Sequence, residues 1–572
     1  MSVEFKKYLF ILFAFLTGTL WIYLKNLGNY PVETCVARYL IAFFVFFFFN
    51  ILISNRDVIL SMKKKIIMQI IMAGSLILIS AFVTGVLYQF GIFHSHLIRQ
   101  FVFVFVINAV LYMLGLYFFN KLSESFFLAG VVFLVGTMYS FAFPMGSGIS
   151  WDDQIHYESS LQISHLSDNN FLEADSLLIN VVYSEDDNII EKIFSGSTGD
   201  YENKVNKLYD EGSKYEHTPA SIGMNMVAYL PEAIVLFFAR GMGIKYTYVF
   251  ALGRWAGVIL FSVFLYFSLK KIKSGRLVFF MISMFPTTLF LMANYSYDPW
   301  GIALPMYAFA DYIGILQDAN RKMELKDIIR ICLIFALGFA AKPIYFFMIL
   351  SVLFIDKNKL SCNLSKKKYQ FIVIFTFVVV ALSFIAPYLM TGAGGNDMRG
   401  GDGVDSGMQV AFILSHPLKY AIILMNFLKY YWGLANATVS VSSFAYLGVG
   451  GFSLQFIVFC IVVVFLDKKH GDAEITTFKR RVWTFIIAFI SSCWVATALY
   501  VAYTPVGSET ISGVQWRYLI PLFPFVGYYI SDYRMVAVLR KYISQKLLVS
   551  VASVASVIYA SYCIYDLMLR YY

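Results

Sequence analysis

Long apolar runs recur along the whole of this chain of 572 residues, and few charges interrupt them. A helix needs about 20 apolar residues to cross the hydrocarbon core of a bilayer. Inside that core every backbone polar group must be satisfied within the spanning structure itself. Since 59% of the residues are hydrophobic and only 14% are charged, the sequence predicts an all-α polytopic membrane protein and not a soluble domain.

About fifteen runs are candidate membrane spans. In chain order they are Tyr8–Leu24, Cys35–Ser54, Ile66–Phe90, Phe101–Phe119, Leu122–Phe143, Tyr246–Leu269, Leu277–Ala293, Gly301–Leu316, Ile328–Ala341, Ile344–Ile355, Phe371–Met390, Leu454–Leu466, Val482–Tyr503, Leu519–Ile530 and Leu547–Leu567. The ninth and tenth are short, and only Lys342-Pro343 separates them. If they formed a single span, every later span would be reversed.

The basic residues predict the orientation of these spans. Clusters of Lys and Arg fall at Lys63–Lys65, Lys357–Lys368, Lys468–Arg481 and Arg534–Lys546. Cytoplasmic loops carry an excess of Lys and Arg, so we expect these clusters and the N-terminus inside the cell. The net charge of +10 is then explained without a nucleic-acid partner. We expect a multi-pass protein of the cell membrane.

This orientation leaves two long segments on the outer face, 145–246 and 391–451. The first is polar up to Tyr215 and then apolar, and we expect Thr218–Arg240 to lie along the membrane surface as an interfacial helix. The second opens with a glycine-rich linker, and the aromatic residues Tyr430-Tyr431-Trp432 indicate another interfacial helix.

We expect three parts in the chain. Residues 1–121 form an N-terminal module of four spans. Residues 122–530 form a membrane domain that includes both outer segments. Residues 531–572 form a C-terminal loop and the final span.

An acidic pair stands where the fifth run ends. Asp152 and Asp153 are followed by His156, and all three share one face if Trp151–Leu166 is helical. One interpretation is an acid/base or metal-binding cluster beside the membrane surface. The other is a helix N-terminus, because Asp in a first turn caps a helix and suits its dipole.

Further ionisable residues from distant parts of the chain are expected at the same membrane depth. Asp298 and Arg254 lie at the outer ends of their runs, Lys342 lies in an outer turn, and Arg517 precedes a run entered from outside. Each alone is explained by a snorkelling side chain or an ion pair. Together they predict a site for a phosphate-bearing lipid head group, with Arg and Lys on the phosphate.

The order of these motifs resembles the GT-C superfamily of membrane glycosyltransferases. Short motifs further resemble a bacterial family of predicted polytopic membrane proteins that is labelled as a domain of unknown function. The match runs from about Phe141 to Ile530. The GT-C motifs are Asp152-Asp153 with His156-Tyr157, then Thr218-Pro219 and Tyr229-Leu230-Pro231, then Gly253-Arg254. The motifs of the bacterial family are Ser296-Tyr297-Asp298, Lys342-Pro343-Ile344-Tyr345 and Arg517-Tyr518-Leu519-Ile520-Pro521. The four additional N-terminal spans depart from the superfamily pattern and leave room for a protein partner there.

The resemblance implies a GT-C-like helical bundle that uses a polyprenyl-phosphate sugar donor on the outer face. An acidic residue of the first outer segment would act as catalytic base, which is Asp152 or Asp153 by position, and we prefer Asp153. No cofactor is certain, but some members use a divalent metal, for which Asp152, Asp153 and His156 would be the ligands. The donor phosphate would be held by Arg517, Lys342 and Arg254, with His156, Tyr157, Asp298, Tyr345 and Tyr518 in support.

The leading hypothesis is therefore transfer of a sugar from polyprenyl phosphate to a cell-surface glycan or a lipid-linked acceptor. The first alternative is a transporter or flippase for a lipid-linked glycan, which would need charged residues along a path through the bilayer midplane. The second is a polysaccharide polymerase or ligase that uses a lipid-diphosphate donor.

The predicted orientation can be tested directly. A cysteine introduced at Glu185, in the first outer segment, should react with a membrane-impermeant thiol reagent on intact cells. Labelling that requires cell lysis would contradict the orientation.

Overall fold

The computed structural model describes residues 61–92, 97–165, 171–180, 198–217, 224–241, 244–391, 403–467, 477–530 and 542–569. The first two predicted spans, the Glu185 segment, Thr218-Pro219 and the glycine-rich linker lie outside these residues. Within the described residues the chain is helical, and its only β-pairings are isolated bridges. The all-α prediction is confirmed for this part of the chain.

The chain divides into two compact units, one ending at Phe119 and one running from Asn120 to Leu567. The described helices of the first unit are α3 (Ser61–Gln89) and α4 (Leu97–Phe118). Those of the second unit are α5 (Glu124–Ala142), α6 (Asp153–Ser164), α7 (Glu173–Ile179), α9 (Thr198–Glu211), η1 (Met224–Tyr229), α10 (Leu230–Gly241), α11 (Tyr246–Lys271), α12 (Arg276–Ser283), α13 (Pro286–Met292), α14 (Asp298–Gln317), α15 (Leu325–Ala340), η2 (Pro343–Val352), η3 (Lys357–Lys359), α16 (Lys366–Thr391), α17 (Ser406–Ser415), α18 (Pro417–Tyr431), α19 (Leu434–Val441), η5 (Ala445–Leu447), α20 (Ser453–Leu466), α21 (Phe478–Ala502), η7 (Trp516–Leu522), α22 (Phe523–Ile530) and α24 (Gln545–Ile564).

Seven helices of the described residues are long and apolar enough to cross a membrane, and the bent pair α17–α18 would make eight. They are Ile71–Gln89, Leu97–Phe118, Glu124–Ala142, Tyr246–Lys271, Lys366–Ala386, Phe478–Ala502 and Gln545–Leu567. A multi-pass membrane protein is therefore supported. This count does not confirm the predicted number of about fifteen spans, of which the first two lie outside the described residues.

Proline explains part of the difference, because it lacks an N–H and ends or breaks a helix. The run Leu277–Ala293 divides into α12 and α13, with Pro286 as the first residue of α13. The short run after Lys342 begins at Pro343 and forms the 3-10 helix η2. The run Leu519–Ile530 is shared between η7, which contains Pro521, and α22.

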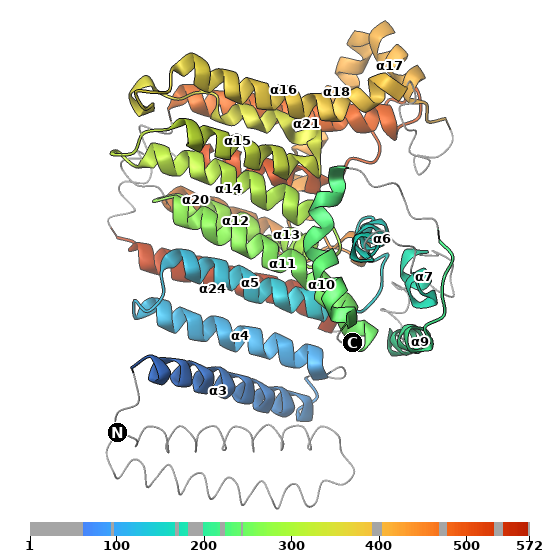
Figure 1. The fold of residues 1–572 in the computed structure, drawn as a ribbon, viewed down its shortest axis with the longest axis vertical. Helices are drawn as coiled ribbons and strands as arrows, with labels where there is room; N and C mark the ends of the chain where they lie inside the picture. The colour runs from blue at the N-terminus through green and yellow to red at the C-terminus, as the bar shows by residue number, and fades with distance from the viewer. Residues whose placement is uncertain are drawn as a thin grey trace, which may run out of the picture. The chain divides into compact units, whose positions relative to one another are not determined.

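The second unit is a layered bundle in which α11 packs between α5 and α14 (Figure 1). From α14 the packing continues to α15 and then α16, while η2 lies against both α16 and α21. On the other side α24 packs on α5, where the hydroxyl of Tyr139 donates to the carbonyl of Ala560 over 2.9 Å.

The helices α6, α7, α9 and α10 gather at one end of this bundle, which we call the cap end (Figure 1). The helix α10 packs on both α6 and α11. It has 12 residues, too few to cross a bilayer, and leaves Ile234, Phe237 and Phe238 exposed. That this segment lies along the membrane surface stays a prediction.

A buried carboxylate fastens the cap helices to α11. Asp175 of α7 accepts hydrogen bonds from the hydroxyls of Tyr157 in α6 and Tyr246 in α11. Its other oxygen accepts from the backbone N–H of Leu172 over 2.8 Å. Because the carboxylate is buried and fully hydrogen-bonded, it fixes the positions of α6, α7 and α11 relative to one another.

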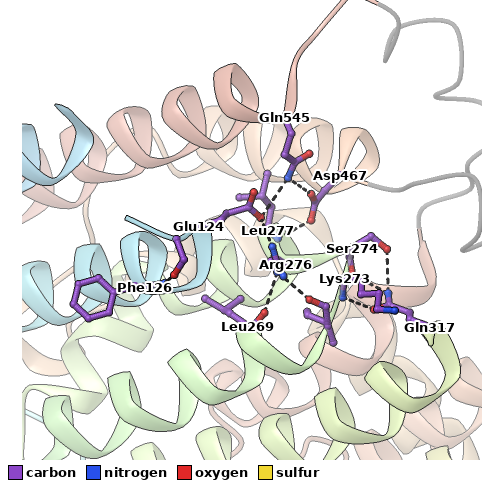
Figure 2. Close-up of polar contacts among 12 residues, drawn as sticks. Glu124, Phe126, Leu269, Lys273, Ser274, Arg276, Leu277, Gln317, Asp467 and Gln545 are labelled. Carbon is purple, nitrogen blue, oxygen red and sulfur yellow. Dashed lines mark hydrogen bonds and ion pairs between the residues drawn. The ribbon is translucent and has the colours of Figure 1, made fainter. Parts of the chain in front are cut away.

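Polar contacts also tie the helices together at the opposite end of the bundle (Figure 2). The guanidinium of Arg276 donates to the carbonyls of Leu269 and Ile272, each over 2.9 Å, and lies 3.3 Å from a Glu124 oxygen. Asp467 accepts from the Leu277 N–H over 2.7 Å and from the Gln545 amide over 3.0 Å.

Asp311, within the predicted eighth span, belongs to this opposite end as well. It is fully buried in α14 and pairs with Lys271 of α11 over 2.8 Å and with Arg330 of α15 over 2.6 Å. A carboxylate paired with two cations in this way joins three neighbouring helices.

The close packing of α11 and α14 predicts the effect of one substitution. A Cβ added to Gly314 would overlap the carbonyl oxygen of Lys271, whereas one added to Gly301 in the same helix meets nothing within 4 Å. Gly314→Ala should therefore lower the free energy of unfolding by about 1–3 kcal/mol. Gly301→Ala is the matched control and should cause no loss, because alanine favours helix over glycine. Thermal unfolding in detergent measures both, and equal stability of the two variants would contradict the packing.

Candidate functional site

The site begins with the turn between α5 and α6. Asp153, the first residue of α6, accepts from the backbone N–H of Gly148 over 2.6 Å and of Ser150 over 3.1 Å. Its side chain is buried, and this burial raises its pKa to about 6 against the opposing effect of the two N–H groups and Arg254. Asp153 therefore holds the turn in shape from within.

Arg254 holds the same turn from α11. Its guanidinium donates to the carbonyls of Pro144 and Gly146, each over 2.7 Å, and lies 4.5 Å from the centre of the Phe250 ring. The residue is only 1% exposed. These contacts of Arg254 position the turn.

The turn directs Trp151 and Asp152 toward those other cations. Asp152 has a positive φ of 56°, an uncommon conformation for a non-glycine residue, and it is only partly buried. The charge of Asp152 acts on both Lys342 and Arg517. The guanidinium of Arg517 lies 4.7 Å from the centre of the Trp151 ring.

Asp298 is the centre of the charged cluster. As the first residue of α14, it pairs with Arg517 of η7 over 2.7 Å and with Lys342, between α15 and η2, over 3.3 Å. The side chain of Arg517 is 1% exposed and that of Lys342 is 13% exposed. Three segments far apart in the sequence therefore meet at one buried carboxylate, which offsets part of the cost of burying both cations.

Tyrosine rings surround the ammonium group of Lys342. Its Nζ lies 4.1 Å from the ring centre of Tyr518, 5.1 Å from that of Tyr297 and 5.9 Å from that of Tyr345. The hydroxyl of Tyr345 also donates to the carbonyl of Tyr518 over 3.0 Å. These aromatic faces stabilise the cation where little water reaches it.

His156 joins the cluster from α6. Its Nδ1 lies 2.7 Å from the hydroxyl of Tyr229, and its ring packs edge-on against Tyr297 with centres 4.7 Å apart. Tyr157, the next residue, points to Asp175 and Tyr246 instead, since neighbouring helical residues point about 100° apart.

The structure thus brings together most of the side chains that the sequence suggested. Gathered at this cluster are Asp152, His156, Asp298, Lys342, Tyr345, Arg517 and Tyr518. Asp153 and Arg254 support the turn behind it, and Tyr157 belongs to the cap. Sequence reasoning missed Trp151, Tyr229 and Tyr297, although each lies in or beside a motif that it identified.

The metal hypothesis does not fit this geometry. Within the described residues, no group of three or more His, Cys, Asp and Glu side chains is arranged to hold a metal ion. Both oxygens of Asp153 accept backbone hydrogen bonds, so Asp152, Asp153 and His156 do not form a ligand set.

These features define a multi-pass helical membrane protein with a buried charged cluster at the cap end of its bundle. A family model described as "Predicted membrane protein (DUF2142)" matches residues 133–526, and the chain belongs to this family. The match includes every residue of the cluster and confirms the predicted membrane-protein family. No curated protein and no solved structure matches the chain.

Proposed function

We propose that the protein is an inverting glycosyltransferase that moves a sugar from a polyprenyl-phosphate donor to a glycan or lipid-linked acceptor. One observation carries the proposal: Arg517 and Lys342 meet at Asp298, and the turn whose Trp151 packs on Arg517 carries a partly buried carboxylate, Asp152, whose negative charge stabilises both cations. Glycosyl transfer from a phosphate needs both a base for the acceptor and cations for the leaving group.

Arg517 and Lys342 are the proposed phosphate-binding residues. A guanidinium and an ammonium group make strong charge-assisted hydrogen bonds to phosphate oxygens. In the described structure both contact Asp298. The donor phosphate would therefore share the two cations with Asp298, which keeps them positioned when the site is empty.

Asp152 is the proposed base, in place of Asp153, which is preferred from the sequence alone. Both oxygens of Asp153 are engaged by the turn, and the side chain is buried. Asp152 is less buried, and its charge stabilises both Lys342 and Arg517. His156 is proposed to support the site through its contact with Tyr229.

The proposed reaction is a single displacement. The carboxylate of Asp152 takes the proton of the acceptor hydroxyl while the hydroxyl oxygen forms a bond to the anomeric carbon. The bond from that carbon to the phosphate oxygen breaks, and polyprenyl phosphate leaves with the electron pair. Arg517 and Lys342 stabilise the charge that develops on the leaving oxygen. Attack from the opposite side inverts the anomeric centre.

The finer parts of the architecture also belong to this proposal. We infer a GT-C-like bundle of about fifteen crossings with the cap end on the outer face of the cell membrane. Its support is the distribution of Lys and Arg in the sequence and the position of the acidic turn after an apolar helix. Incubation of purified protein with radiolabelled polyprenyl-phosphate sugar and a membrane-derived acceptor tests the activity.

Asn substitutions distinguish the two carboxylates. Asp152→Asn should nearly abolish transfer while leaving thermal stability and donor binding almost unchanged, because it removes only the proton-accepting charge. Asp153→Asn should instead lower thermal stability, since its amide NH₂ would face a backbone N–H donor. Rates and melting temperatures measured side by side decide the point. Full transfer by Asp152→Asn would refute the proposed base.

Removal of either cation should weaken donor binding. Arg517→Ala and Lys342→Ala should each reduce affinity about tenfold or more, which is the effect of losing a charge-assisted contact worth about 1.5–3 kcal/mol. Arg330→Ala is the matched control, because it breaks a comparable ion pair with Asp311 at the opposite end of the bundle. If donor affinity falls equally in the control variant, the phosphate site is not at Arg517 and Lys342.

A further inference from the structure

An apolar groove lies beside the charged cluster, between α12, α19, α20, α21 and α22. Its cavity has a volume of about 320 Å³, within the range of ligand-binding pockets. Its described lining includes no charged, amide or hydroxyl side chain. Val278, Met281 and Val526 form a buried floor, whereas Ile461, Phe485 and Ile530 are exposed at the rim. The groove is therefore open along one side of the bundle.

The groove runs lengthwise along the bundle and begins at the depth of the charged cluster. Trp516 lines it and directly precedes Arg517, which binds Asp298. Ile530 lines its other end, two residues beyond Tyr528, whose hydroxyl contacts Gln317 at the opposite end of the bundle. The 3-10 helix η7 rises about 2.0 Å per residue and α22 about 1.5 Å, so Trp516 to Ile530 covers at most roughly 25 Å. This length is most of the roughly 30 Å hydrocarbon core of a bilayer.

Trp516, which lines the groove and directly precedes Arg517, carries a buried hydrogen-bond donor. The indole N–H of Trp516 is buried and has no hydrogen-bond partner within the described residues. Buried N–H groups usually have an acceptor, so this donor is available to a polar atom of a bound ligand. The rest of the groove offers only apolar contact.

We propose that this groove holds the isoprenoid chain of a polyprenyl phosphate whose phosphate lies on Arg517 and Lys342. The arrangement matches such a molecule in order: two cations in the cluster, then Trp516 next to Arg517, then an apolar lining that continues to Ile530. An apolar chain buried there contributes about 0.8 kcal/mol per methylene, so the tail and the phosphate both add to affinity. The proposal rests on the proposed function for its choice of head group.

The groove also accounts for recognition of a single chain. Its lining is rich in branched and aromatic side chains, including Val441, Ile457 and Phe523, which pack well against the methyl branches of an isoprenoid. One groove of about 320 Å³ beside one phosphate site fits a lipid with one tail. A glycerophospholipid would have to leave its second chain outside.

Photolabelling tests the groove independently of catalysis. The full-length protein in nanodiscs is exposed to a polyprenyl monophosphate that carries a diazirine on its chain, and labelled peptides are mapped by mass spectrometry. We expect labels on α20 and α22, with competition by unlabelled polyprenyl phosphate but much weaker competition by phosphatidic acid. Equal competition by phosphatidic acid would identify an ordinary lipid site and overturn the proposal, as would labels confined to other helices.

A matched pair of variants on α19 sharpens the test. Ala437 lines the groove, whereas Ala435 is exposed and does not. Ala437→Trp should fill the channel and weaken binding of the polyprenyl phosphate about tenfold, the effect of excluding roughly two methylene groups. Ala435→Trp should bind normally. Equal binding by both variants would overturn the groove as the tail site.

The outcome also separates this inference from the proposed function. Groove labelling that is lost in Ala437→Trp, in a protein that transfers no sugar, would support the lipid site and refute the glycosyltransferase. Sugar transfer that is unchanged in Ala437→Trp would support the enzyme and refute the groove. Trp516→Phe keeps the aromatic ring but removes the N–H, and it should weaken binding of polyprenyl phosphate while leaving binding of the uncharged polyprenol unchanged.

Discussion

The ion pairs of Asp298 with Arg517 and Lys342 are the interaction on which the cap end of the bundle depends. A buried cation without a counterion would cost several kcal/mol, and two adjacent cations would also repel each other. The carboxylate at the start of α14 lowers both costs. It also brings η7 and the break between α15 and η2 to the same place, so one charge organises three segments.

The same logic operates at the opposite end of the bundle with a different result. There Asp311 joins α11, α14 and α15 through Lys271 and Arg330, and Asp467 joins the starts of α12 and α24. In the described structure those contacts have no group of tyrosine rings like the one around Lys342, and no acidic turn like the one that carries Asp152. The chemistry we propose is therefore assigned to the end where the cations lie among several tyrosines, next to the turn that carries Asp152.

The broken helices connect the charged cluster with the apolar groove. Proline prevents η2, α13 and the η7–α22 segment from forming straight uninterrupted helices, and the breaks supply the positions of Lys342 and Arg517. Irregular backbone at membrane depth is tolerated where it is buried in protein or lines a cavity. The segment η7 contributes to both features, because Arg517 belongs to the charged cluster and Trp516 lines the groove.

The sequence by itself determined the class of the protein and most members of the cluster. Apolar runs are read directly from the order of residues in the sequence. A charge at the end of such a run is conspicuous because burying it is costly. For that reason the amino-acid sequence alone is enough to single out Asp298, Lys342 and Arg517. The tertiary structure decided which of them touch and which neighbours they share. Neighbouring residues such as Asp152 and Asp153, or His156 and Tyr157, look equivalent in a sequence, but a turn and a helix point them to different partners. The groove could not be predicted either, because its apolar lining residues resemble any others in a membrane helix until the packing of five helices leaves a space between them.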